Sequence, residues 1–160
     1  MKICALLLLS FCLVLVAEGQ PVKKHGQLRV EGIQLKDKKR KPLTLRGMSF
    51  GWHNFHPRFY TKGAVRTLYK NWGCTVVRAS MGIEPKGGYL QNPQAGKEKI
   101  KIVVDASIKE GLYVIIDWHS HNIQLEEAKK FFTEMAQTMG SIQISFMKFS
   151  TSLIRNRGRK

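Results

Sequence analysis

The chain has 160 residues and a formal net charge of +16 at pH 7. A chain of this length accommodates one domain of ordinary size. The charge favours contact with polyanions such as nucleic acid, acidic lipid surfaces or pectin-like glycans. It comes without a helix-turn-helix, a ribonucleoprotein motif or a zinc-ligand spacing, so specific nucleic-acid binding is not expected. Much of it lies in a solvated turn at 36–41, and general surface charge is preferred over a dedicated basic site.

The first 19 residues are typical of a secretory signal peptide. Lys2 supplies a positive start, residues 6–16 are apolar, and residues 17–19 offer small side chains where a signal peptidase reads. A buried N-terminal helix is the alternative. No later segment is long and apolar enough to span a bilayer. We therefore expect a secreted, extracellular protein with no membrane partner. Cys4 and Cys12 would leave with the signal peptide, so Cys74 would remain alone in the mature chain and form no internal disulfide.

The elements follow one another in a regular order. Alternating polarity over 28–35, followed by a charged turn at 37–42, predicts a small antiparallel hairpin. Periodicity and end signals then predict a strand (43–50), an aromatic loop (51–57), a helix capped by Thr61 and ended by Gly73, a strand (75–80), a loop (81–95), a helix around 100–108, a strand that ends at Asp117, and a helix over 128–139.

The strand that follows Gly111 indicates the fold class. Residues 112–116 are continuously apolar, which is typical of a strand covered on both faces in a parallel α/β sheet. Three alternating strand–helix units give such a sheet with right-handed crossovers. Parallel sheets place their chemistry at the carboxyl ends of their strands, so we look there for site residues.

Polar and aromatic side chains occupy these strand ends. An arginine there can hold a carboxylate in its charged form, and a histidine can donate to a sugar hydroxyl or a catalytic carboxylate. A tryptophan offers a flat face that suits the C–H side of a sugar ring. The candidates are Arg78 after the second strand, Asp117, Trp118 and His119 after the third, and Trp52, His53 and His56 after the first.

Simpler interpretations stand beside these. Asp117 is expected to neutralise Arg78 or a nearby imidazole rather than to act on substrate. Trp52 is an equally good core residue. His119 and His121 could clamp a metal, but no third ligand lies at a useful spacing, so neither a metal nor a cofactor is expected. No Gly-x-Ser-x-Gly elbow, P-loop or dinucleotide motif is present.

Four motifs lie in order between residues 26 and 140. They are Leu45-Arg46-Gly47-Met48-Ser49, Val76-Val77-Arg78-Ala79-Ser80-Met81, Gly87-Gly88-Tyr89, and Gly111-Leu112-Tyr113-Val114-Ile115-Ile116-Asp117-Trp118-His119. Together they resemble glycoside hydrolase family 5. The closest likeness is to the secreted β-1,4-endoglucanases of plant-parasitic nematodes, which degrade cellulose in plant cell walls.

The resemblance implies a (β/α)8 barrel of the TIM type that hydrolyses the O-glycosidic bonds of cellulose by a retaining, two-glutamate mechanism. This chain holds the N-terminal hairpin and about the first three βα units of that barrel. By similarity, Arg78 and His119 match the arginine and histidine that surround the catalytic carboxylates. Trp52 and Trp118 are the expected substrate-binding positions, and cellulose or another β-glucan is the expected partner.

The two catalytic glutamates are missing from this sequence. In the family, the acid/base lies in an Asn-Glu-Pro motif that ends the fourth strand, and the nucleophile ends the seventh. Without either, we expect the chain as written to lack hydrolytic activity. Two alternatives stay open: a non-catalytic glycan binder that uses Trp52, Trp118 and Tyr89, and a basic secreted effector that acts through its charge.

Residues 141–160 depart from the family pattern and contain no acidic residue. Family members continue here with a sequence close to Ile-Pro-Asn-Ile-Ile-Tyr-Glu-Ile-Phe-Asn-Glu-Pro, and one DNA spelling of it yields residues 142–152 after the loss of one cytosine. We interpret the tail as a frameshifted reading of the catalytic fourth strand, with a genuine alternative terminus as the other possibility. The expected plan is a signal peptide (1–19), the N-terminal part of a family 5 catalytic domain (20–140) and a divergent basic tail (141–160).

Overall fold

A parallel sheet organises the structure, a computed structural model that describes residues 19–122, 124–139 and 145–151. The four strands run in the order β3-β4-β5-β6, and every neighbouring pair is parallel. The alternation of strands and helices predicted from the sequence is confirmed. The strands are β3 (Gly47–Trp52), β4 (Val76–Gly82), β5 (Tyr113–Ser120) and β6 (Ser145–Thr151).

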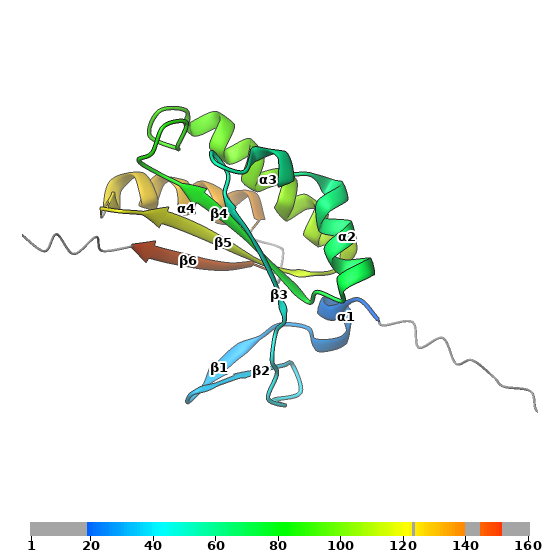
Figure 1. Ribbon diagram of the computed structural model, residues 1–160. Helices are drawn as coiled ribbons and strands as arrows, with labels where there is room; N and C mark the ends of the chain where they lie inside the picture. Colours follow the sequence, from blue (N-terminus) through cyan, green and yellow to red (C-terminus); the bar gives the residue numbers. More distant parts are fainter. Residues whose placement is uncertain (1–18, 123, 140–144, 152–160) are drawn as a thin grey trace, which may run out of the picture.

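Three helices cover one face of this sheet, as Figure 1 shows. They are α2 (Lys62–Trp72), α3 (Pro93–Glu110) and α4 (Leu125–Met139). The predicted end signals of α2 are confirmed, since the Thr61 hydroxyl accepts from the Ala64 N–H and Gly73 takes a left-handed φ of 64°. Gly111 ends α3 in the same way, with a φ of 72°. The opposite face of the sheet carries no helix among the residues that the structure describes (Figure 1).

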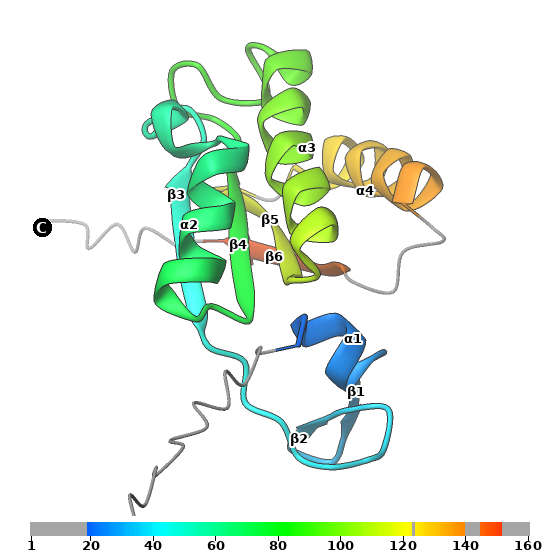
Figure 2. The same cartoon turned by 90° about the vertical axis from the view of Figure 1, so that its right-hand side faces the viewer.

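A small N-terminal unit lies below the amino ends of the strands (Figures 1 and 2). The predicted hairpin is confirmed as β1 (Arg29–Glu31) paired antiparallel with β2 (Gln34–Lys36). A short helix that the sequence did not predict, α1 (Pro21–His25), precedes it. The unit is tied to the sheet because the Tyr113 hydroxyl donates to the Gly26 carbonyl at 2.6 Å.

The core lies between the sheet and its helices. Alternate residues of β4 and β5 point into it, and the intervening residues point to the bare face of the sheet. The strand residues Val77, Ala79, Met81, Val114, Ile116 and Trp118 pack there with Val65, Ile100, Val103, Val104, Phe131 and Met135 from the helices.

The first parallel strand begins later than the sequence predicts, at Gly47 instead of Leu43. The Leu43 N–H donates to the Leu35 carbonyl, so this segment belongs to the hairpin unit. Pairing with β4 starts only where Gly47 meets Val76. A Cβ atom on Gly47 would overlap the Val76 carbonyl, so the strand entrance requires glycine.

Candidate functional site

Polar side chains gather at the carboxyl ends of the strands, on the bare face of the sheet. Strand register creates the grouping: Trp52 pairs with Ser80, and Ser80 pairs with Asp117. Registered residues of parallel strands point to the same face. The pairing of the strands therefore brings these side chains together.

Asp117 is the centre of the hydrogen-bond network. Its side chain is fully buried, and its Oδ2 atom lies 2.5 Å from Nη2 of Arg78. The same oxygen accepts from the Ser80 hydroxyl at 2.8 Å and lies 3.0 Å from Nδ1 of His119. Arg78 also donates to the Ser49 hydroxyl through Nη1, at 3.0 Å. The network holds Arg78 and His119 in fixed positions at the carboxyl ends of the strands.

His119 has two ways to complete this network. Its Nδ1 atom lies 2.9 Å from Nη2 of Arg78 as well as near Asp117. Arginine can only donate, so contact with it requires an unprotonated Nδ1 and leaves the proton on Nε2. A protonated Nδ1 donates to Asp117 instead. With the first tautomer, Nε2–H is directed away from the network and can donate to a bound hydroxyl.

An aromatic cluster adjoins this network. The Trp52 ring lies 4.8 Å from the His119 ring and 5.3 Å from the His121 ring, centroid to centroid. Phe55 stacks almost parallel on Trp52, with an interplanar angle of 11° and a centroid distance of 5.4 Å. Because Phe55 is 57% exposed, it presents an open apolar face beside the polar network. The expected position of Trp52 near the site is thus observed, and Phe55 extends it.

Trp118 does not belong to this surface. Its side chain is fully buried against the helices, 4.9 Å from the Tyr89 ring and 5.5 Å from the Phe131 ring. The expectation that it contacts substrate is wrong for this structure. It lies between Asp117 and His119 in β5, and alternation directs it to the opposite face. Tyr89 is buried with it, so neither ring can stack on a glycan.

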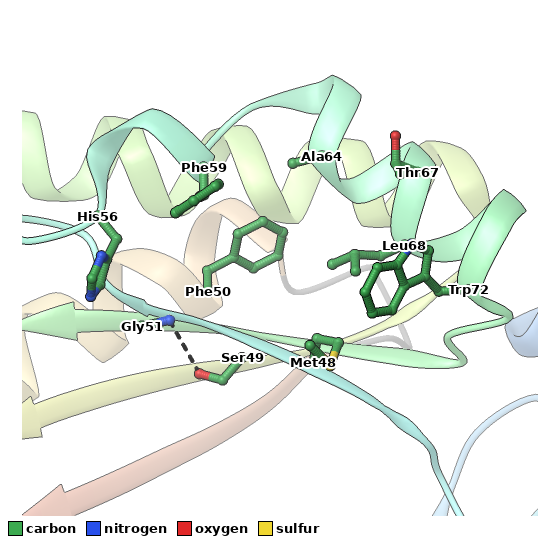
Figure 3. A pocket seen from close by; sticks show the side chains of 10 residues that line it. All are labelled: Met48, Ser49, Phe50, Gly51, His56, Phe59, Ala64, Thr67, Leu68 and Trp72. Carbon is green, nitrogen blue, oxygen red and sulfur yellow. Dashed lines mark hydrogen bonds between the residues drawn. The ribbon is translucent and has the colours of Figure 1, made fainter.

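The two histidines of the first loop also differ from His119. His53 is almost fully buried, and its Nδ1 atom accepts from the Gly82 N–H at 3.3 Å. Burial and the nearby Lys99 charge lower the pKa of His53 to about 4. His56 lies outside the network and packs beside Gly51 and Phe59 (Figure 3). Both are structural in this arrangement.

Glu84 is the other carboxylate at this end of the sheet. It accepts from the N–H groups of His121 at 3.0 Å and of Asn122 at 2.9 Å. Partial burial acts to raise its pKa, but hydrogen bonds from the N–H groups of Asn122, His121 and Glu84 itself and from the Gln124 side chain together hold the pKa of Glu84 below its usual range. A general acid needs a raised pKa, so Glu84 is suited to fixing the loop after β5.

No metal-binding cluster is found in the described part of the chain, where no three His, Cys, Asp or Glu side chains lie close enough to hold an ion. The same residues include no helix that could cross a membrane. Cys74 is a buried free thiol, and burial raises its pKa.

A separate apolar groove runs along the outer edge of β3 (Figure 3). Its volume is about 520 Å³, and its walls come from β3, the 56–59 loop and α2. Met48, Phe59, Leu68 and Trp72 line it, and Trp72 is 66% exposed. The groove shares Ser49 with the polar site, but its other walls lie on the helix side of the sheet edge (Figure 3).

Sequence reasoning missed three contributors to the site: Ser49, Ser80 and Phe55. Ser80 lies two residues after Arg78 in β4, so strand alternation would have placed both on the face of Asp117. Phe55 follows Trp52 in a turn closed by the Phe55 N–H on the Trp52 carbonyl at 3.1 Å. No local sequence pattern predicts that the two rings stack.

Comparison with known proteins fits this geometry. A family model described as cellulase (glycosyl hydrolase family 5) matches residues 36–143. The chain is 41% identical over 129 residues to an endoglucanase from Clostridium saccharobutylicum, which covers 78% of this chain and 29% of the relative. It is 42% identical over 106 residues to endoglucanase Z from Dickeya dadantii, covering 63% of this chain and 25% of the relative.

Solved structures give the same result. The catalytic domain of Thermobifida fusca endoglucanase Cel5A superimposes with a TM-score of 0.76 at 33% identity, over 81% of this chain and 44% of that one. A variant of that enzyme was solved in complex with cellotetraose, with the same TM-score of 0.76. The chain thus spans less than half the length of these structures and under a third of the two endoglucanases above. Its parallel sheet, covered by helices on one face, is part of a (β/α)8 barrel, and the chain belongs to glycosyl hydrolase family 5.

Proposed function

We propose that this chain is the N-terminal, substrate-holding part of a secreted β-1,4-endoglucanase and that it binds cellulose-type β-glucan. One observation carries the proposal: the stacked Trp52–Phe55 pair lies directly beside the Arg78–Asp117–His119 network, at the carboxyl ends of parallel strands. The names of the bacterial relatives and the cellotetraose complex of one neighbour support it. The nematode likeness and the export signal at 1–19 belong to the same proposal.

The chemistry of the two parts is complementary. The C–H faces of a β-linked glucose ring are apolar and stack on an aromatic ring, while its hydroxyls need hydrogen-bond partners. Phe55 and Trp52 supply the apolar face, and Nε2 of His119, a donor in one tautomer and an acceptor in the other, supplies a hydrogen-bond partner for a hydroxyl. Arg78 is held by Asp117 and Ser49, so its guanidinium is fixed in position and its charge is balanced by the Asp117 carboxylate.

We further propose that the chain as written binds glucan without cleaving it. A retaining mechanism needs an acid/base and a nucleophile whose carboxyls are ~5–5.5 Å apart. At this end of the sheet, Asp117 is bound by Arg78 and Ser80, and Glu84 is bound by backbone N–H groups. The glutamates at 98, 110, 126, 127 and 134 lie on α3 and α4, which cover the opposite face of the sheet from the polar network (Figure 1).

The frameshift proposal places the missing acid/base next to this site. The family match ends at residue 143, just before β6. In β6, register pairs Ser120 with Thr151. Restoring the frame would turn codon 151, the last residue of β6, into asparagine and the next codon into glutamate. Sequencing the transcript across codons 141–143 tests this, and an unambiguous read of the present protein with no downstream cellulase frame would overturn it.

Polyanion binding has one specific observation in its favour. An exposed basic stripe runs along α2, where Lys62, Arg66 and Lys70 are spaced four residues apart. Successive members are ~6 Å apart along the helix axis. None of the three makes an ion pair with any residue that the structure describes. Neutralising all three to Gln should weaken polygalacturonate binding more than neutralising three exposed hairpin-turn lysines, and equal losses would reject the stripe.

Calorimetric titration with cellotetraose tests the main proposal. Trp52→Ala should abolish the binding heat or weaken affinity by about tenfold, because it removes one of the two stacked rings and leaves Phe55 with no ring to stack on. The matched control is Trp72→Ala, which removes an exposed indole from the groove on the other side of β3 and should leave affinity unchanged. Equal affinities for wild type and Trp52→Ala would remove the proposed site.

A further inference from the structure

Strand β3 contains one more residue than its partner strand at the site. Ser49 pairs with Arg78 and Trp52 pairs with Ser80, so three steps along β3 match two along β4. This is a β-bulge, and it reverses the alternation of the strand. Phe50 points into the core, and without the bulge Trp52, two residues later, would follow it. The bulge is what directs Trp52 toward His119.

Gly51 is the residue that makes the bulge possible. Its φ is +71°, a left-handed conformation that side chains with a Cβ rarely adopt. A Cβ at Gly51 would also lie 2.7 Å from Cδ2 of His56, which covers it in Figure 3. The backbone of the bulge is therefore specified by its own residue, but that residue has no side chain with which to anchor it.

Tyr60 provides the anchor. Its side chain is fully buried, and its hydroxyl lies 2.6 Å from the Gly51 carbonyl. The same hydroxyl accepts from the Ser80 N–H at 3.0 Å and lies 2.7 Å from the Ser80 carbonyl. That carbonyl already accepts from the His53 N–H at 3.0 Å. A carbonyl oxygen can accept two hydrogen bonds, so the single hydroxyl proton lies within reach of both carbonyls, with that of Gly51 slightly nearer. One side chain thus joins the bulge to β4.

We propose that Tyr60 is a positioning residue for glucan binding: its hydroxyl holds the β3 bulge against β4 and thereby fixes the Trp52 ring against His119. The inference rests on the proposed glucan site. Ser80 connects Tyr60 to the polar network, because its backbone N–H donates to the Tyr60 hydroxyl and its own hydroxyl donates to Asp117. One buried hydroxyl thus connects the aromatic pair to the polar network.

The test is Tyr60→Phe, which keeps the ring that packs 5.5 Å from Phe50 and removes only the hydroxyl. The matched control is Tyr113→Phe, which removes a hydroxyl bonded to the Gly26 carbonyl at the other end of the sheet. We expect Tyr60→Phe to weaken cellotetraose affinity by about tenfold and Tyr113→Phe by less than about twofold, since only the first releases the bulge.

A second readout separates positioning from general loss of stability. The His119 ring protons feel the ring current of Trp52 at 4.8 Å, so their NMR shifts report that contact without any ligand. They should move in Tyr60→Phe and stay in place in Tyr113→Phe. Unchanged His119 shifts and unchanged affinity in Tyr60→Phe would overturn the inference. Moved shifts in a protein that never binds cellotetraose would keep Tyr60 as the anchor of the bulge and reject the glucan site instead.

Discussion

Arg78 and Asp117 form an ion pair in which Nη2 and Oδ2 are 2.5 Å apart and the carboxylate has no exposed surface. Asp117 therefore neutralises the arginine, as the sequence led us to expect, and is not free to attack a substrate. Three further groups surround the pair: Ser49 on the arginine, and Ser80 and His119 on the carboxylate. The pair is the fixed point from which the site is built.

Replacing Asp117 by Asn should destabilise the fold by about 3 kcal/mol, because it leaves the Arg78 charge partly buried without its counter-ion. Urea unfolding monitored by circular dichroism measures this. Asp105→Asn is the control, since Asp105 pairs with Lys101 on an exposed helix face and should cost less than about 1 kcal/mol. Similar decreases in the free energy of unfolding in the two variants would show that the buried ion pair contributes no more to stability than the exposed one.

His53 should make the fold sensitive to mild acid. The unfolded side chain titrates near pH 6.5, whereas burial and Lys99 lower the pKa in the folded protein to about 4. Between these values the unfolded chain binds the extra proton, so stability is complete above pH 6.5 and is lost as the pH falls toward 4. The full loss is about 3 kcal/mol, from the size of the shift.

His53→Asn isolates this effect, because the amide oxygen can still accept from Gly82 but cannot titrate. We expect the free energy of unfolding of the variant to change less between pH 6.5 and 5 than that of the wild type. Parallel pH profiles for the two proteins would contradict the assignment of the acid sensitivity to His53.

Phe55 should matter for glucan binding as much as Trp52 does. Its ring is the exposed member of the stacked pair, so Phe55→Ala should weaken cellotetraose affinity by about five- to tenfold, as expected for the loss of one stacking ring. Phe59→Ala is the control, because Phe59 is similarly exposed but lines the groove on the other side of β3. A loss of cellotetraose affinity in Phe59→Ala but not in Phe55→Ala would show that the glucan binds in that groove instead.

The apolar groove and the net charge should act in opposite directions on solubility. Exposed Met48, Phe59 and Trp72 favour self-association, and β3 is an edge strand of the sheet in the part of the chain that the structure describes. The charge of +16 keeps chains apart at low ionic strength, and salt screens it. We therefore expect poor folding or aggregation of the 160-residue chain at physiological salt, detected by light scattering.

Substituting the groove should relieve that tendency. Trp72→Gln should raise the salt concentration at which scattering begins, while Leu90→Gln, at an exposed leucine outside the groove, should have little effect. A sharp, cooperative melt of a soluble wild-type monomer at all salt concentrations would contradict the expectation.

Local sequence signals were sufficient for most of the fold. The caps at Thr61 and Gly73 and the apolar run after Gly111 each placed an element, because the interactions responsible lie within a few residues. The start of β3 was misplaced because it depends on where β4 begins to pair with it. The short helix α1 has no apolar periodicity, and its Val22 N–H donates to the carbonyl of Gly111, the residue that ends α3.

The site was harder, because its geometry depends on which face each residue occupies. In β5, alternation separates Trp118 from Asp117 and His119, so the sequence contained the signal that excludes Trp118. In β3, alternation fails at Gly51, and only the pairing with β4 shows that Trp52 faces the site. The role of Tyr60 depends on contacts with Gly51 and Ser80 that no local pattern encodes.

The release of reducing ends from carboxymethylcellulose tests the central claim most directly, which is that this chain carries the substrate-holding residues of the family but not its hydrolytic glutamates. The assay compares the purified 160-residue chain with a protein in which the family reading frame is restored after codon 141 and read to its own stop. We expect turnover from the restored protein and none from the chain as written. Turnover by the 160-residue chain would contradict the account.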